Sequence, residues 1–130
     1  MVHENRRCHM ILGLHHAQIT IPTGAEEEGK QFYCKLLGLE EIEKPESLKG
    51  RGGFWLKVGN QSVHVGIEDG FDRRTTKAHL AYLVDDLTYW KNLFNQHELE
   101  IKEGIPIPGF DRFECRDPFG NRIEMIQAKE

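Results

Sequence analysis

The sequence has few cysteines, and their spacing indicates neither a disulfide framework nor a thiolate metal site. The three cysteines, Cys8, Cys34 and Cys115, are an odd number, and no two of them are spaced as C-x-x-C. Small disulfide-rich domains and zinc-thiolate sites depend on such pairs. We expect Cys34 and Cys115 to be small buried hydrophobic residues, because they fall in a helix-like and a strand-like pattern.

The sequence also lacks an excess of basic residues and any long apolar segment. Its 17 Lys and Arg against 21 Asp and Glu give a formal net charge of -4, which argues against general binding to nucleic acids or anionic membranes. The apolar runs fall far short of the roughly 20 residues that a membrane span requires, and the first residues lack a secretory apolar region. We therefore expect a soluble, cytoplasmic protein.

Length and composition predict a single folded domain. The chain has 130 residues, of which 38% are hydrophobic and 29% are charged, enough apolar material for one core. The polar character of residues 1–10 predicts a flexible N-terminal extension. We expect one domain over residues 11–130.

Hydrophobic periodicity predicts the same order of elements twice. Alternating apolar and polar residues indicate strands, and apolar residues three and four apart indicate helices. In a first module, about 14–68, we expect a strand at 14–21, a helix at 25–38 and strands at 39–43, 53–58 and 62–68. In a second module, about 77–127, we expect a strand at 79–84, a helix capped by Asp85 or Asp86, and strands at 99–102, 112–115 and 122–127. The predicted fold class is α+β, built from two β-α-β-β-β modules.

Four side chains that can bind a metal ion occupy equivalent places in the two modules. His16 and His79 begin the first strands and are 63 residues apart, while His64 and Glu124 lie in the last strands and are 60 residues apart. Each of the four lies opposite the clearest apolar face of its strand. In a sheet backed by helices, that opposite face lines a cavity.

Three imidazoles and one carboxylate suit a divalent ion such as Zn, Fe, Ni or Mn. The predicted cofactor is one such ion per chain, bound by His16, His64, His79 and Glu124. An ion of this kind can polarise a substrate oxygen or stabilise the anion that deprotonation of the substrate produces.

Other residues have two interpretations from sequence alone. His15 points to the face opposite His16 if the strand alternates strictly, which favours packing or an interface. Three arginines could bind an anionic substrate or be exposed strand charges: Arg112, Arg116 and Arg122. Four aromatic residues could wall a pocket or pack in the core: Phe54, Trp55, Phe110 and Phe113.

Four stretches of the sequence carry recognisable motifs. They are residues 14–19 (LHHAQI), 31–39 (QFYCKLLGL), 78–87 (AHLAYLVDDL) and 117–124 (DPFGNRIE). Together they resemble the signature segments of the vicinal oxygen chelate superfamily, which includes glyoxalase I, fosfomycin-inactivating thiol transferases, methylmalonyl-CoA epimerase, extradiol dioxygenases and bleomycin-binding proteins. The resemblance covers about residues 11–128. Its motifs are specific for the superfamily and not for one reaction.

The resemblance implies a glyoxalase-like fold, in which two modules form a cupped, half-open mixed sheet around one metal ion, commonly in a homodimer. His16, His79 and Glu124 match ligand positions of the family. His64 stands where glyoxalase I has a glutamate that takes part in proton transfer. His64 is therefore either a further ligand or an acid/base beside the ion, and His64 and Glu124 are the candidate catalytic residues.

The expected function is that of a glyoxalase-like metal-dependent enzyme, a lyase or isomerase. It would act on a small-molecule substrate with adjacent oxygen atoms through a metal-stabilised enolate or alkoxide. One alternative is an extradiol-type ring-cleaving dioxygenase that uses ferrous iron. The other is a non-catalytic protein that binds a small molecule and confers resistance to it.

Overall fold

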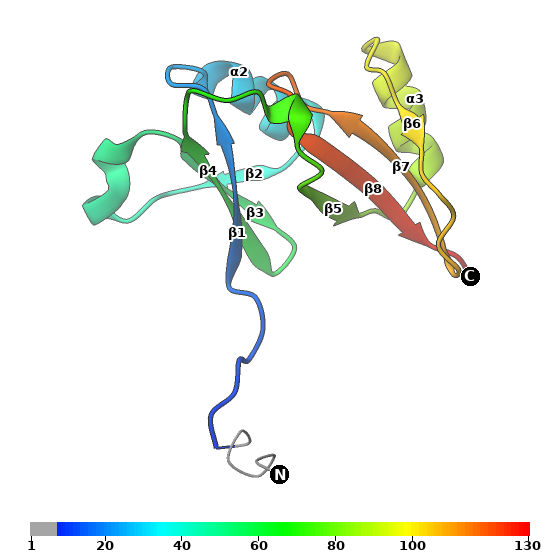
Figure 1. Ribbon diagram of the computed structural model, residues 1–130, viewed down its shortest axis with the longest axis horizontal. Coiled ribbons are helices and arrows are strands. Elements are labelled where there is room, and N and C mark those ends of the chain that lie inside the picture. Colours follow the sequence, from blue (N-terminus) through cyan, green and yellow to red (C-terminus); the bar gives the residue numbers. More distant parts are fainter. Residues whose placement is uncertain (1–7) are drawn as a thin grey trace.

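The computed structural model describes residues 8–130, arranged as two β-α-β-β-β modules side by side (Figure 1). The elements of the first module are β1 (His16–Ile21), α2 (Glu26–Lys30), η1 (Gln31–Leu36), β2 (Glu40–Ile42), η2 (Glu46–Arg51), β3 (Phe54–Val58) and β4 (Gln61–Ile67). The short η3 (Arg73–Thr75) follows. The second module contains β5 (His79–Leu83), α3 (Leu87–Gln96), β6 (Lys102–Glu103), β7 (Phe110–Arg116) and β8 (Arg122–Ala128). The predicted α+β class and the repeated element order are confirmed.

Each module forms its own four-stranded mixed sheet. The strand orders are β1-β4-β3-β2 and β5-β8-β7-β6, so the first strand of each module lies parallel to its last strand at one sheet edge. Among residues 8–130 no backbone ladder joins the two sheets. The cupped sheet expected from the resemblance is therefore divided into two halves within one chain, and β1 and β5 are both edge strands.

Local sequence signals explain most of the element boundaries. Gly59, with a φ of 60°, makes the turn that pairs β3 with β4, as the Gly-Asn dipeptide predicts. The Asp86 carboxylate accepts a hydrogen bond from the Tyr89 backbone N–H at 3.2 Å and caps α3. One strand is shorter than predicted. In place of the strand expected at 99–102, β6 spans only Lys102–Glu103, at the edge of its sheet.

The expected helix over 25–38 consists of two pieces. The short α2 continues as η1, a π-helix whose wide turn is closed by a hydrogen bond from Leu37 N–H to Phe32 C=O. Two consecutive residues, Phe32 and Tyr33, are both buried in this segment. A 3.6-residue hydrophobic period does not reveal this widened turn.

A buried hydrogen bond links the two modules. The Tyr33 hydroxyl donates to Asp117 Oδ2 at 2.6 Å, across 84 residues of sequence. Burial, together with the Asp117 carboxylate, raises the pKa of Tyr33 well above its usual value, so the hydroxyl remains a donor. Asp117 also accepts from the Asn121 side chain at 2.8 Å, which fixes the turn between β7 and β8. The apolar core surrounds this link and includes residues of both modules.

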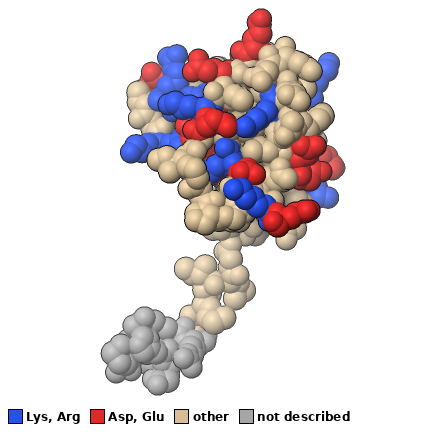
Figure 2. Space-filling view, turned by 90° about the vertical axis from the view of Figure 1, so that its right-hand side faces the viewer, with Lys and Arg blue, Asp and Glu red and all other residues tan. Residues whose placement is uncertain are grey.

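The segment before β1 leaves the body of the protein as an extended arm (Figures 1 and 2). Its apolar side chains are exposed, with Ile11 at 95% and Leu12 at 90%. Figure 2 shows charged side chains of both signs mixed over the body and none on the described part of the arm. Of the predicted flexible extension over residues 1–10, residues 1–7 lie outside the described part of the chain. In the described residues, no helix is long and apolar enough to span a membrane.

Candidate metal and substrate site

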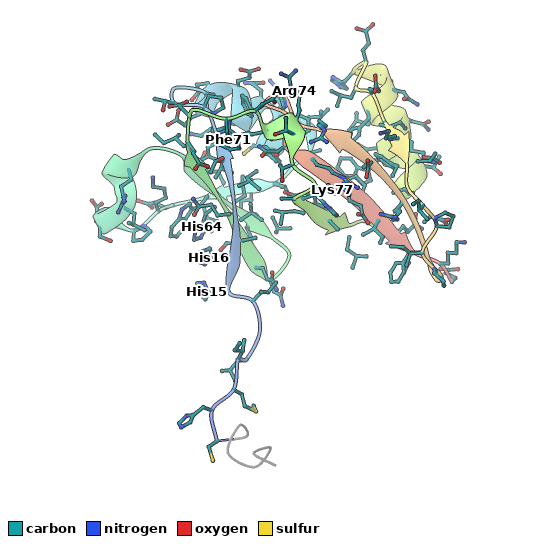
Figure 3. The ribbon with its side chains drawn as sticks, in the orientation of Figure 1. His15, His16, His64, Phe71, Arg74 and Lys77 are labelled. Atoms are coloured by element: carbon teal, nitrogen blue, oxygen red, sulfur yellow. The ribbon has the colours of Figure 1, made fainter. Side chains whose placement is uncertain are left out.

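The first pair of predicted ligands, His16 and His64, lies on adjacent strands of one sheet. In the parallel pairing of β1 with β4, His16 is opposite Ser62 and Gln18 is opposite His64. Because side chains alternate along both strands, the two imidazoles share a face, and their ring centroids are 3.9 Å apart. In Figure 3 both rings lie on the side of β1 that faces away from β5 and β8.

His64 is the buried member of this pair. Its ring lies between the His16 ring and the Trp55 indole, and it accepts or donates a hydrogen bond with Ser62 Oγ at 3.3 Å. Burial lowers the pKa of His64, and the neighbouring His16 and His15 lower it further. His64 is therefore a neutral imidazole at neutral pH, the form that binds metal ions.

His15 lies beside this pair and not on the opposite face. Its Nδ1 is 2.9 Å from His16 Nδ1, and the ring is exposed (Figure 3). The prediction that His15 faces the other side was wrong. The reason is that β1 begins at His16, so the alternation of a strand does not extend back to residue 15.

The second pair, His79 and Glu124, lies at the equivalent place in the other module. His79 Nε2 is 3.1 Å from Glu124 Oε1, and His79 Nδ1 is 2.9 Å from the Lys77 carbonyl oxygen. A carbonyl oxygen only accepts hydrogen bonds, so Nδ1 carries the proton. In the neutral imidazole, Nε2 then presents a lone pair to a carboxylate, and two acceptors face each other. A shared cation, either a proton or a metal ion, satisfies both of them.

The Glu124 side chain is almost fully buried and held by a third group. Arg112 Nη1 donates to Glu124 Oε1 at 3.1 Å, and the same guanidinium donates twice to the Ile105 carbonyl oxygen. Glu124 Oε2 makes no hydrogen bond with the described residues. The carboxylate is thus oriented through one oxygen, while the other stays available for a ligand or a proton.

The other candidate residues have mostly structural roles. Arg122 pairs with Glu114, and Arg116 donates to the Gly120 carbonyl oxygen at 2.9 Å, so neither guanidinium is unpartnered. Phe54 and Phe113 are buried in the core. Cys115 is buried as expected, and burial raises the pKa of its thiol to about 12. Cys34 is only half-buried.

The two pairs do not meet within one chain. Over residues 8–130, no three His, Cys, Asp or Glu side chains gather closely enough to hold a metal ion. The structure therefore brings together His16 with His64 and His79 with Glu124, each pair at the open edge of its own sheet. A single centre made of all four residues stays a prediction.

A polar cavity of about 350 Å³ adjoins His64. Trp55 contributes to its wall, together with two cations from the segment between β2 and β3, Lys44 and Arg51. Neither cation is among the site residues predicted from the sequence. The signal that could have revealed them is the pair Gly52-Gly53, whose φ angles of 74° and 78° mark a tight, shaped loop.

Most of the chain matches one known protein family. Residues 13–125 match the family described as Glyoxalase/Bleomycin resistance protein/Dioxygenase superfamily. The chain belongs to this superfamily. The same fold recurs in solved structures, one of which, from Bacillus anthracis, is described as a member of the glyoxalase family. It is 41% identical, with a TM-score of 0.85, and the match covers 93% of this chain and 98% of that one.

Two solved structures of much lower sequence identity share the fold. The fosfomycin resistance protein FosX from Listeria monocytogenes, solved with Mn(II) and sulfate, is 16% identical with a TM-score of 0.74, and the match covers 92% of this chain and 93% of FosX. Lactoylglutathione lyase from Agrobacterium tumefaciens is 18% identical with a TM-score of 0.68, and the match covers 90% of this chain and 94% of the lyase. At this level of identity, the likeness is one of fold alone. A comparison with curated protein sequences gave no match.

Proposed function

We propose that the protein is a homodimeric, glyoxalase-like metalloenzyme that acts on a small molecule with adjacent oxygen atoms. Each centre would combine His16 and His64 of one subunit with His79 and Glu124 of the other. The observation that carries this proposal is the 3.1 Å separation of His79 Nε2 and Glu124 Oε1, which are both acceptors when neutral His79 has its proton on Nδ1. Their arrangement suits a shared divalent cation.

The topology supports a site shared between subunits. β1 and β5 are edge strands that a neighbouring subunit could cover, and they carry His16 and His79. The second member of each pair, His64 or Glu124, lies on the adjacent strand, β4 or β8. A two-fold axis that places β1 of one copy beside β5 of the other generates the same contact twice. Such a dimer would hold two complete centres. The Mn(II) described in FosX supports a divalent ion in this fold.

The donor set fits a divalent ion whose remaining coordination positions stay open to substrate. A bound ion would polarise a substrate oxygen. His79 is fixed in the tautomer that leaves Nε2 free, because Nδ1 donates to the Lys77 carbonyl oxygen. Arg112 holds Glu124 through Oε1, so Glu124 Oε2 can take a proton from the substrate. His64 would supply either a further nitrogen ligand, beside His16 and His79, or the second proton-transfer group.

The proposal is tested by mixing two defective subunits. One double variant is His16→Ala/His64→Ala, and the other is His79→Ala/Glu124→Ala. Each should lose bound metal when purified alone, measured by elemental analysis after dialysis. The co-expressed heterodimer, isolated with two different tags, should regain about one ion per dimer, because one of its centres then has all four ligands.

A matched control and a size measurement complete the test. His97→Ala removes an exposed histidine at the end of α3 and should leave the metal content unchanged. Light scattering should give twice the chain mass of 15.1 kDa. A heterodimer without metal would show that no centre is shared between subunits, and a strictly monomeric protein would overturn the proposal. The metal-loaded protein is then assayed on hemithioacetals, epoxides and catechols to identify the reaction.

A further inference from the structure

The cavity beside His64 has an unusual balance of charge. The chain carries more acidic than basic residues, yet none of the described residues that line this cavity is Asp or Glu. Lys44, Arg51 and Gln18 provide nitrogen donors to the lining. Its volume of about 350 Å³ is within the range that small-molecule sites occupy.

The two cations are not neutralised by ion pairs. The Arg51 guanidinium makes no hydrogen bond or ion pair with any described residue, and the Gln18 side-chain amide is likewise without a hydrogen-bond partner in this part of the chain. Lys44 Nζ donates to the Gly52 carbonyl oxygen at 2.7 Å, which holds the ammonium in place without cancelling its charge. The nearby Glu26 carboxylate lies outside the lining and accepts a hydrogen bond from the Gly53 N–H at 3.1 Å.

The backbone around the cavity is built to keep this space open. A Cβ on Gly66 would lie 2.6 Å from Gln18 Nε2, and a Cβ on Gly53 would lie 2.1 Å from the Val65 carbonyl oxygen. Glycine at both positions therefore allows the loop and β4 to approach without filling the cavity. In the shared view of Figures 1 and 3, the segment that contains η2 lies on the same side of β1 as His64.

From these observations we infer that Lys44 and Arg51, assisted by Gln18, form a subsite for an oxyanion group of the substrate. The group is a carboxylate, phosphate or phosphonate carried by the small molecule whose oxygen atoms reach the centre at His64. This inference rests on the proposed function, because the subsite adjoins one of the proposed ligands. Charged hydrogen bonds of this kind are stronger than neutral ones and orient the bound group.

The test uses metal-free protein and three simple anions at equal ionic strength: inorganic phosphate, methylphosphonate and acetate. Titrations followed by ¹H–¹⁵N NMR should show saturable shifts of the Gly52, Gly53 and Gly66 amides. The anion with the lowest Kd identifies the oxyanion class. The Kd of that anion should rise about tenfold in Arg51→Gln and in Lys44→Gln, as expected for the loss of one charged hydrogen bond.

The control is Lys102→Gln, which removes the same charge from the exposed strand β6, away from the cavity. The Kd of the anion for this variant should equal its Kd for the wild type. If Lys44→Gln disturbs the loop, Arg51→Gln still tests the subsite, because the Arg51 side chain makes no hydrogen bond with the loop. Equal Kd values in all variants, or non-saturating shifts spread over the surface, would overturn the subsite.

Metal content measured on the same variants separates this inference from the proposed function. Normal metal binding with no anion binding in the wild type would reject the subsite and leave the metal centre standing. Anion binding that depends on Arg51, in a protein that takes up no metal, would reject the metal centre and leave an oxyanion-binding protein.

Discussion

The Trp55 indole and the His64 imidazole lie face to face, with centroids 3.7 Å apart and planes 1° from parallel. They are direct neighbours in the antiparallel pairing of β3 with β4. With His16 on its other face, the His64 ring is confined from both sides. The indole therefore positions a proposed ligand and also forms part of the cavity wall.

Replacing Trp55 should weaken metal binding through His64. Stacked aromatic pairs contribute about 0.5–1.5 kcal/mol, so we expect Trp55→Ala to raise the metal Kd by up to about tenfold. Trp55→Phe keeps a ring on His64 and should stay close to the wild type. Calorimetric titration of both variants checks this. Unchanged affinity in Trp55→Ala would show that the stacking does not position His64.

His64→Ala should distinguish the two roles of His64 when metal content and turnover are measured together. Loss of metal indicates a ligand. Full metal content with turnover lowered by about 10²- to 10⁴-fold indicates an acid/base. His64→Gln is the companion variant, because it keeps a polar side chain of similar size between Trp55 and His16. Normal metal content and normal turnover in both variants would remove His64 from the site.

The strands and the faces on which the candidate ligands lie were predictable because alternation is a local signal, and the repeat of the element order indicated which strands correspond. Alternation in β1 and β4 puts His16 and His64 on one face, and the parallel pairing of these strands makes them neighbours. The separation of this pair from His79 and Glu124 depends on how the two modules pack, and no short pattern encodes that packing. Tyr33, in the π-helical turn, shows the difficulty, since its partner Asp117 is 84 residues away.

The subsite cations were missed for a related reason. Lys44 and Arg51 lie in a segment without hydrophobic periodicity, and their approach to His64 depends on the left-handed conformations of Gly52 and Gly53. Conversely, Arg112 and Arg122 were predicted as candidates for binding an anionic substrate because they lie on strands. In the structure, Arg112 forms an ion pair with Glu124, and Arg122 forms one with Glu114.

Tyr33→Phe should destabilise the fold without affecting the metal centre. The change removes the hydroxyl that donates to Asp117 Oδ2 and leaves the Asn121 amide as the remaining side-chain donor to that oxygen. Loss of a buried hydrogen bond to a charged group costs about 1.5–3 kcal/mol. Urea unfolding should show this decrease in the free energy of unfolding. Tyr89→Phe, at an exposed tyrosine on α3, is the control and should unfold like the wild type.

Glu26 should contribute to stability in a pH-dependent way. The hydrogen bond from the Gly53 N–H lowers the pKa of Glu26 below its usual value of 4.5, and the Lys30 and Lys44 charges lower it further. Because the folded state holds this proton less tightly than the unfolded state, the contribution is fully present above about pH 4.5. It is lost as the pH falls through the lowered pKa. Glu26→Gln should therefore flatten the acid side of the stability profile, measured by urea unfolding between pH 3 and pH 6. The control is Glu27→Gln, at the exposed neighbouring residue, and it should leave the stability profile close to that of the wild type. Equal profiles for Glu26→Gln and the wild type would show that the Gly53 contact does not stabilise the fold.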